Sequence, residues 1–204
     1  MQKLTALILS SRDAGEFDRI YTLYTRESGL MRVVGRGVRK PAAKLAGHLE
    51  PGTLSEVYVA RSRGMGQITS AITISNFESV RNNFEKLEES LKILRFFARN
   101  FSEEEKDERI FDLLGDFLGA LGNLENRDYR EGILTEAFWW KLFDFLGHRP
   151  QIMKCMRCDE KLEEKGRSFF SAALGGTLCE KCARHGVIPA EITLNQIKLL
   201  RIIL

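Results

Sequence analysis

The first 77 residues alternate short apolar runs with glycine-rich turns, a pattern typical of small β-domains. Five runs rich in apolar and β-branched residues predict five strands: Leu4–Ser10, Ile20–Tyr24, Leu30–Val34, Leu54–Ala60 and Gln67–Ile74. Turn residues such as Gly15, Gly29 and Pro51-Gly52 separate these runs. This pattern predicts an OB-fold barrel, and an SH3-like barrel competes because strand count alone does not separate the two.

From residue 78 the apolar spacing changes to three and four, which predicts amphipathic helices. The first carries the apolar stripe Val80, Phe84, Leu87, Leu91, Leu94, Ala98 and Phe101. Ser102 with Glu105 predicts the cap of a second, whose core side is Ile110, Leu113, Leu114, Phe117, Leu118 and Leu121. Asp128 with Glu131 predicts the cap of a third, carrying Ile133, Phe138, Trp139, Leu142, Phe143 and Leu146. These helices are expected to form a small bundle with the aromatic residues in its core.

A last helix is predicted after Thr193, because Thr193 and Gln196 have the spacing of a capping box. Its apolar run ends at Leu204, where the helix would fray, so we expect the natural chain to continue. The fold class is therefore α+β. Four parts are expected: an OB-fold nucleic-acid-binding domain (1–77), a helical domain (78–150), a four-cysteine zinc module (151–190) and a C-terminal helix start packing on the helical domain (191–204).

Charge is distributed unevenly along the chain, although the net charge is only +3. Residues 1–77 hold 11 Lys and Arg against 6 Asp and Glu, whereas residues 78–131 hold 9 against 14. The basic front suggests a polyanionic partner, and the acidic middle suggests a protein partner or solubility. No run of about 18 apolar residues occurs, so we predict a cytoplasmic protein with no membrane partner.

All four cysteines fall into two Cys-x-x-Cys pairs, Cys155 with Cys158 and Cys179 with Cys182. Two such pairs supply the four thiolates of a closed tetrahedral zinc site, which is structural because no coordination position stays open. An iron–sulfur cluster uses the same ligands and is the alternative. We therefore predict structural Zn²⁺ as the cofactor.

No catalytic motif accompanies this metal site. The sequence has neither a phosphate-binding loop of the G-x-x-x-x-G-K-[ST] type nor a dinucleotide-binding G-x-G-x-x-G between strand and helix. Its histidines have no evident nucleophile or carboxylate partner in sequence. We therefore expect no enzymatic activity and no small-molecule substrate.

A basic segment follows the third predicted strand. Its members are Arg32, Arg36, Arg39, Lys40 and Lys44, and no Asp or Glu lies among them. On an OB-like barrel such a cluster favours nucleic-acid binding over a merely solvated loop. Tyr21, Tyr24 and Tyr58 are the candidates for stacking on bases.

These features together resemble the bacterial recombination mediator family RecO. The matching stretches are Ala14-Gly15-Glu16-Phe17-Asp18-Arg19-Ile20, Leu23-Tyr24-Thr25, Gly29-Leu30, Gly35-Arg36-Gly37-Val38-Arg39-Lys40-Pro41 and Leu49-Glu50-Pro51-Gly52-Thr53-Leu54. The order of barrel, helices and cysteine pairs also agrees. Two departures are Ala14, where a Tyr often stands, and the C-terminal helices expected after Leu204.

The resemblance implies an N-terminal OB-fold, a helical domain and a zinc-ribbon-like insertion. It also implies binding to single- and double-stranded DNA, annealing of complementary strands and, with RecR, loading of RecA onto DNA covered by single-strand-binding protein. Arg36, Arg39, Lys40 and Lys44 would be DNA contacts, and the four cysteines metal ligands. Two other classes stay open: a protein–protein adaptor, and a zinc-ribbon transcription or RNA-binding factor.

Overall fold

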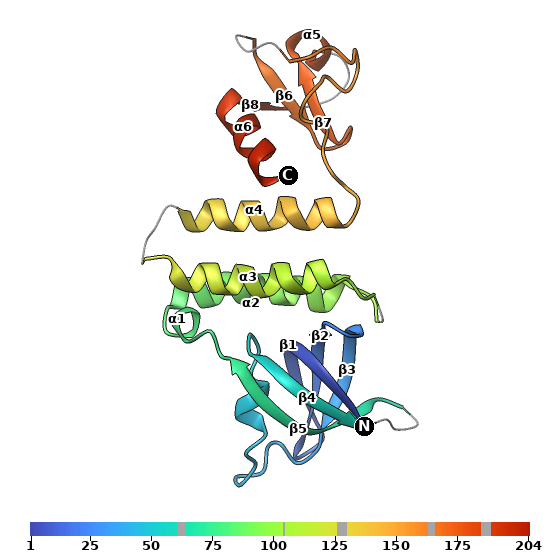
Figure 1. Cartoon of the computed structure of the whole chain (residues 1–204), viewed down its shortest axis with the longest axis vertical. Helices are drawn as coiled ribbons and strands as arrows, with labels where there is room; N and C mark the ends of the chain where they lie inside the picture. The colour runs from blue at the N-terminus through green and yellow to red at the C-terminus, as the bar shows by residue number, and fades with distance from the viewer. Residues whose placement is uncertain (61–63, 104, 126–129, 163–165, 185–188) are drawn as a thin grey trace. The chain divides into compact units, whose positions relative to one another are not determined.

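Five strands close into a barrel at the N-terminal end of the chain (Figure 1). They are β1 (Gln2–Ala14), β2 (Asp18–Thr25), β3 (Gly29–Gly35), β4 (Leu54–Ala60) and β5 (Gly66–Ser75). The strand order is β1-β2-β3-β5-β4, and β4 pairs with β1 to close the barrel. Neighbouring strands are antiparallel except β3 and β5, which are parallel. The barrel is OB-like, which confirms the predicted OB-fold.

The computed structural model describes residues 1–60, 64–103, 105–125, 130–162, 166–184 and 189–204, apart from the side chains of 130 and 131. Contacts within the chain divide it into two compact units, residues 1–131 and 132–204. The barrel and the first helices belong to unit 1, and the cysteines belong to unit 2. The finer division into four parts stays a prediction.

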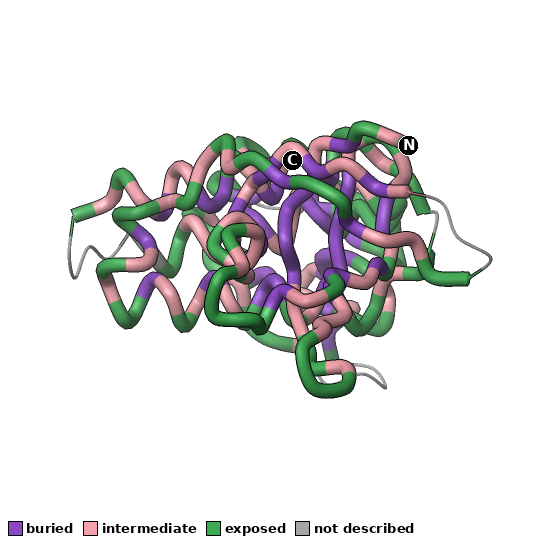
Figure 2. Tube along the Cα trace, turned by 90° about the horizontal axis from the view of Figure 1, so that it is seen from below, coloured by how far each residue is buried: buried purple, intermediate pink, exposed green. Residues whose placement is uncertain are grey.

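Strand β1 is buried on both of its faces, which explains its nearly continuous apolar run. Leu4, Ala6 and Ile8 point into the barrel core together with Tyr21 and Val57. The core also includes Leu23, Val33, Val38, Leu49, Val59, Ile68 and Ala71. Figure 2 shows the buried positions gathered along the barrel strands. Leu7, on the opposite face of β1, is also buried.

The outer face of the barrel is partly covered by helices. These are α1 (Glu78–Arg81), α2 (Phe84–Asn100) and α3 (Glu108–Asn123), of which α2 packs against β1 (Figure 1). Tyr24 of β2 lies edge-on to Phe97 and Phe101, with ring centroids 6.0 and 5.9 Å away. Burial raises the pKa of Tyr24 to about 12. Aromatic packing therefore joins the barrel to α2.

Two details of the predicted helices are wrong. The helix expected from Ser102 begins instead at Glu108, with Asp107 as its N-cap. Ser102 N–H does donate a hydrogen bond to the Glu105 carboxylate. The segment is nevertheless extended and paired with the barrel, because Glu103 forms an isolated β-bridge with Leu30. The first helix is interrupted before Asn83, the N-cap of α2.

The interruption changes which side chains are buried. Phe84, expected in the core, is 79% exposed at the first turn of α2. In α4 (Arg130–Phe145), Phe138 and Leu142 are buried, whereas Ile133 and Phe143 are exposed, as is Leu146 just after the helix. The predicted apolar stripe of α4 is therefore wider than the face it buries. The cap expected at Asp128 lies outside the described residues.

Unit 2 places α4 with a small sheet and two further helices. The elements are β6 (Ser168–Ser171), β7 (Gly176–Cys179), α5 (Glu180–Ala183), β8 (Ala190–Ile192) and α6 (Leu194–Ile203). The sheet order is β7-β6-β8, and both pairs are antiparallel. Trp140 of α4 lies edge-on to Phe170 at 5.5 Å. The capping box predicted for Thr193 and Gln196 is confirmed.

Candidate nucleic-acid surface and metal centre

The loop between β3 and β4 presents the predicted basic side chains to solvent. Arg36, Arg39, Lys40 and Lys44 are all exposed, and Arg32 is exposed on β3. Val38 is only 4% exposed because its side chain enters the barrel core. An apolar anchor among basic neighbours therefore fixes this part of the loop, and the charged side chains are left outside.

The β1–β2 hairpin holds the basic loop through backbone hydrogen bonds. Gly37 N–H donates to the Asp18 carboxylate at 2.7 Å, and Arg39 N–H donates to the Phe17 carbonyl at 3.0 Å. The Arg39 guanidinium also lies 3.5 Å from the Gly15 carbonyl oxygen. The loop therefore has a defined conformation before any ligand binds, which lowers the entropy cost of binding.

Acidic residues from other elements reach two of the basic side chains. Arg39 pairs with Asp13 at 3.2 Å, and Arg32 pairs with Glu103 at 2.6 Å. The basic segment itself contains no Asp or Glu, which predicted a cluster without neutralising partners. That prediction is wrong for Arg32 and Arg39, because carboxylates from other elements pair with them. In the described part of the chain, Arg36, Lys40 and Lys44 have no ion pair within 4 Å, and Lys40 lies over the Phe17 ring. Arg36 and Lys44 have neither an ion pair nor a cation–π contact among the described residues, so their charge is the least compensated of the set.

The predicted stacking residues are mostly unavailable to bases. Tyr21 and Tyr24 are 1% and 0% exposed, because one fills the barrel core and the other packs under α2. Tyr58 is half-buried and donates to Glu56 at 2.7 Å. The exposed aromatic ring beside the basic loop is instead Phe17, which is 38% exposed, with Lys40 Nζ 5.7 Å from its centroid. The exposure of Phe17 could have been predicted from the sequence, because Phe17 is an apolar residue within the polar turn Gly15-Glu16-Phe17-Asp18.

The four cysteines meet in unit 2, as predicted. The sulfur atoms of Cys155, Cys158, Cys179 and Cys182 all lie within 4.8 Å of one another. Cys155 and Cys158 belong to a turn after α4, closed by a hydrogen bond from Asp159 N–H to the Cys155 carbonyl at 3.0 Å. Cys179 ends β7 and Cys182 lies in α5. The fold thus brings both pairs to one point.

The chemistry of this donor set fits one metal ion. Burial raises the pKa of the Cys155 thiol, but backbone N–H groups of Cys158, Cys179 and Arg157 outweigh burial and lower that pKa to about 6. Cys182 shows the opposite shift, to about 12, chiefly because it hydrogen-bonds Cys179. Four thiolates so close together repel one another, and a divalent cation removes this cost. The cluster is therefore a possible metal site.

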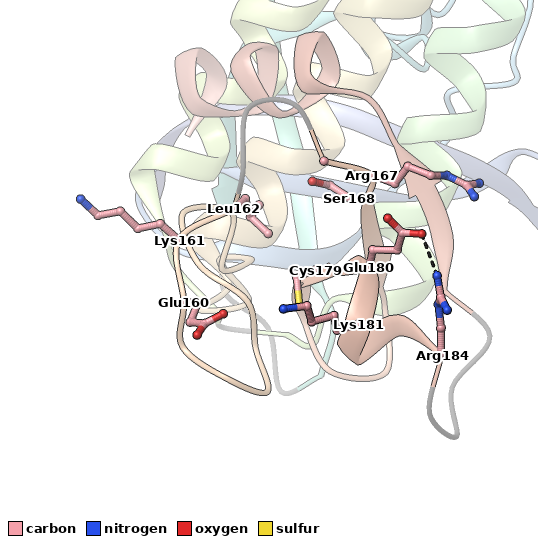
Figure 3. A pocket seen from close by; sticks show the side chains of 10 residues that line it. Glu160, Lys161, Leu162, Arg167, Ser168, Cys179, Glu180, Lys181 and Arg184 are labelled. Atoms are coloured by element: carbon pink, nitrogen blue, oxygen red, sulfur yellow. Dashed lines mark hydrogen bonds and ion pairs between the residues drawn. The ribbon is translucent and has the colours of Figure 1, made fainter.

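A cavity of about 460 Å³ lies beside the cysteine cluster (Figure 3). Cys179 lines it together with charged side chains from the two flanking segments. Glu180 pairs with Arg184 at 2.9 Å, and Arg167 pairs with Glu191 at 2.5 Å. These arginines are thus already neutralised within unit 2. The cavity is therefore a charged hollow beside the cysteine cluster.

None of the described helices has the length and apolar character needed to cross a membrane. The structure defines a class of protein in which an OB-like barrel is followed by helices and a module that holds four clustered cysteines. Within that class the chain belongs to the Recombination protein O family. The model for the N-terminal part of that family matches residues 1–77, and the model for the C-terminal part matches residues 93–204.

Individual relatives agree with this assignment. A DNA repair protein RecO of Dehalococcoides mccartyi is 34% identical over 206 residues, covering 98% of this chain and 77% of the relative. The DNA repair protein RecO of Pelotomaculum thermopropionicum is 29% identical over 204 residues, covering 100% of this chain and 77% of the relative. The DNA repair protein RecO of a Roseiflexus species is 34% identical, covering 96% of this chain and 67% of the relative. The resemblance drawn from the sequence is therefore confirmed.

Proposed function

We propose that this chain binds DNA and acts in DNA repair by recombination. The observation that carries the proposal is the family match, which extends over both units of the chain and includes relatives named DNA repair protein. The exposed basic loop on an OB-like barrel supports it, because such barrels bind nucleic-acid strands through their faces and loops. The protein would act in the cytoplasm, at the nucleoid.

The basic side chains would contact phosphates, not base edges. Arg36 and Lys44 are the first candidates because they are exposed and have neither a carboxylate partner nor a cation–π contact among the described residues. Lys40, Arg39 and Arg32 extend the surface. Phosphate neutralisation releases counterions and reads no sequence, so single and double strands both bind. Annealing of complementary strands follows when two polyanions are held close with their bases free. It needs no nucleophile, so we propose a mediator that is not an enzyme.

The same proposal includes partners and a metal. RecR and single-strand-binding protein would be the protein partners, and the outcome would be RecA loading on covered single strands. Cys155, Cys158, Cys179 and Cys182 would hold Zn²⁺. Zinc would supply a cross-link between the two cysteine pairs and no catalytic chemistry, because four thiolates close its coordination shell.

The decisive experiment reverses the two least compensated charges. Arg36→Glu with Lys44→Glu should weaken binding of a fluorescent oligonucleotide by at least about tenfold, because two phosphate contacts become repulsions. The slope of log affinity against log salt should fall by about 2 for single and double strands alike. Fluorescence anisotropy across a salt series measures both quantities.

A matched control changes the same charge elsewhere. Arg95→Glu with Lys198→Glu alters two exposed cations on α2 and α6, and it should leave the salt slope within experimental error of wild type. Unchanged affinity of the Arg36→Glu, Lys44→Glu variant at moderate salt would contradict the proposal and favour a protein–protein adaptor. Far tighter binding of RNA than of the same DNA sequence would favour an RNA-binding factor.

A further inference from the structure

We infer that the tip of the β1–β2 hairpin is a stacking platform on which the ring of Phe17 receives one unpaired base of single-stranded DNA. The inference rests on the proposed function and deepens it, because it names a contact that a duplex cannot make. Its ligand is a nucleobase face, whereas the basic loop binds phosphates.

The first observation is the exposure of an apolar ring in a polar turn. Phe17 is 38% exposed, and its neighbours Gly15 and Glu16 are exposed as well. Leaving part of a phenyl ring in water forgoes stabilisation that burial would provide. Two of the other three aromatic residues of the barrel, Tyr21 and Tyr24, are buried. A base stacked on Phe17 would cover this apolar surface.

The second observation is that the backbone beneath the ring is fixed. The Phe17 carbonyl accepts from Arg39 N–H at 3.0 Å, and the next residue, Asp18, accepts from Gly37 N–H at 2.7 Å. Ala14 pairs with Asp18 at the end of the hairpin ladder. The backbone on both sides of the turn is thus held by hydrogen bonds or strand pairing. A ring on such a support loses little conformational entropy when a base stacks on it.

The third observation is the arrangement of positive charge around the ring. Lys40 Nζ lies 5.7 Å from the ring centroid, within the range of a cation–π contact. The Arg39 guanidinium lies near the Gly15 carbonyl on the same hairpin. If a base stacks on Phe17, the phosphates of that nucleotide would therefore lie close to the Lys40 and Arg39 side chains. Aromatic rings among cations along a groove are the usual means of binding single strands without sequence preference.

This geometry separates single strands from duplexes. Bases in a duplex are already stacked and paired, so reaching a protein ring costs unstacking energy. Phosphates are equally available in both. Phe17 would therefore add affinity for single strands alone, and the basic loop would bind both forms. Annealing would profit, because a newly formed duplex loses the contact to Phe17 and is released more readily than its strands.

The experiment compares two exposed phenylalanines of unit 1. Phe17→Ala should weaken binding of an oligo(dT) single strand roughly tenfold, as expected for the loss of one stacked base, with duplex affinity unchanged. Phe17→Trp should restore single-strand binding. Phe84→Ala removes a ring that is 79% exposed on α2, and it should leave both affinities as in wild type.

A second measurement locates the contact directly. An oligo(dT) strand carrying one 5-iododeoxyuridine should cross-link on irradiation to the peptide that contains Phe17, and mass spectrometry identifies it. Equal single-strand affinity of wild type and Phe17→Ala, or an equal loss for both DNA forms, would overturn the inference and leave the proposed function standing. Failure of the wild type to bind either form overturns both.

Discussion

Among the described residues, Gly29 is the position at which backbone geometry and tertiary packing together most strictly exclude a side chain. It opens β3 with a φ of +68°, a conformation that L-residues rarely adopt. A Cβ atom at this position would also overlap the backbone carbonyl group of Glu105, in the segment before α3. Gly15 has a similar φ of +74° but faces open space.

Gly29→Ala and Gly15→Ala should therefore differ in cost. Gly15→Ala should lower the free energy of unfolding by about 1 kcal/mol, the strain of a left-handed alanine alone. Gly29→Ala should cost at least about 2 kcal/mol more, because the chain around Glu105 must shift. Urea unfolding followed by circular dichroism measures both. Equal losses would show that the contact with Glu105 yields without cost.

The charge environment of the candidate site was only partly predictable from the sequence. The basic character of residues 36–44 is plain in the sequence, because no acid interrupts it. The pairing of Arg39 with Asp13 and of Arg32 with Glu103 is not, because those carboxylates come from β1 and from the loop after α2. Local composition thus predicts the sign of a surface, whereas the effective charge depends on partners remote in sequence.

At the scale of elements, caps decide where the helices of unit 1 begin. Asp107 caps α3 by accepting from Arg109 N–H, and Asn83 caps α2 by accepting from Lys86 N–H at 3.0 Å. The Arg109 side chain, which hydrogen-bonds the Asp107 carboxylate, holds the pKa of Asp107 below its usual value. One cap is thus charged and the other neutral.

The two caps should respond differently to acid. Asp107→Ala and Asn83→Ala should each lower the free energy of unfolding at pH 7 by about 1 kcal/mol. The folded pKa of Asp107 is depressed, so its contribution is present above its unfolded pKa of about 3.9 and is lost as pH falls through the folded value. Chemical unfolding at neutral pH and near pH 3 should show the Asp107→Ala difference shrinking and the Asn83→Ala difference persisting. A cost at Asp107 that does not change with pH would contradict this account.

Strand prediction succeeded because hydrophobic alternation and turn residues are local signals. All five predicted strands occur in the barrel; the fourth has the predicted bounds, and the structure extends the other four by a few residues at their ends. The start of α3 was predicted too early, because Glu103 and Glu105 suit a first helical turn but are held against the barrel by Leu30 and Tyr24. Tertiary contact overrode a local capping signal there.

At the scale of the whole molecule, the two units differ in the size of their buried cores. The barrel of unit 1 has a core of a dozen buried residues. The cluster around the cysteines contains only Cys155, Leu178 and Ala183 as buried members, with partly buried residues around them. A core of that size needs an additional cross-link, which the proposed structural metal ion would supply.

Metal removal should therefore act on one unit alone. Purified protein should contain one equivalent of zinc, and a strong chelator should accelerate amide exchange in β6, β7 and α5 while the barrel strands keep their protection. Cys155→Ser should give the same pattern without chelator. Elemental analysis and hydrogen exchange with mass spectrometry measure these outcomes. Iron in place of zinc, or joint loss of protection in both units, would contradict the proposal.

The barrel strands, the helical periodicity, the two cysteine pairs and the basic loop could all be predicted from the amino-acid sequence. Each of these depends on residues that are close together along the chain, so spacing and residue type suffice. Which side chains face solvent, in contrast, depended on the folded arrangement of the chain. It buried Tyr21 and Tyr24, exposed Phe17 beside Lys40, and paired Arg39 and Arg32 with distant carboxylates. Exposure and charge pairing depend on neighbours that only folding brings together, which is why the sequence alone did not reveal them.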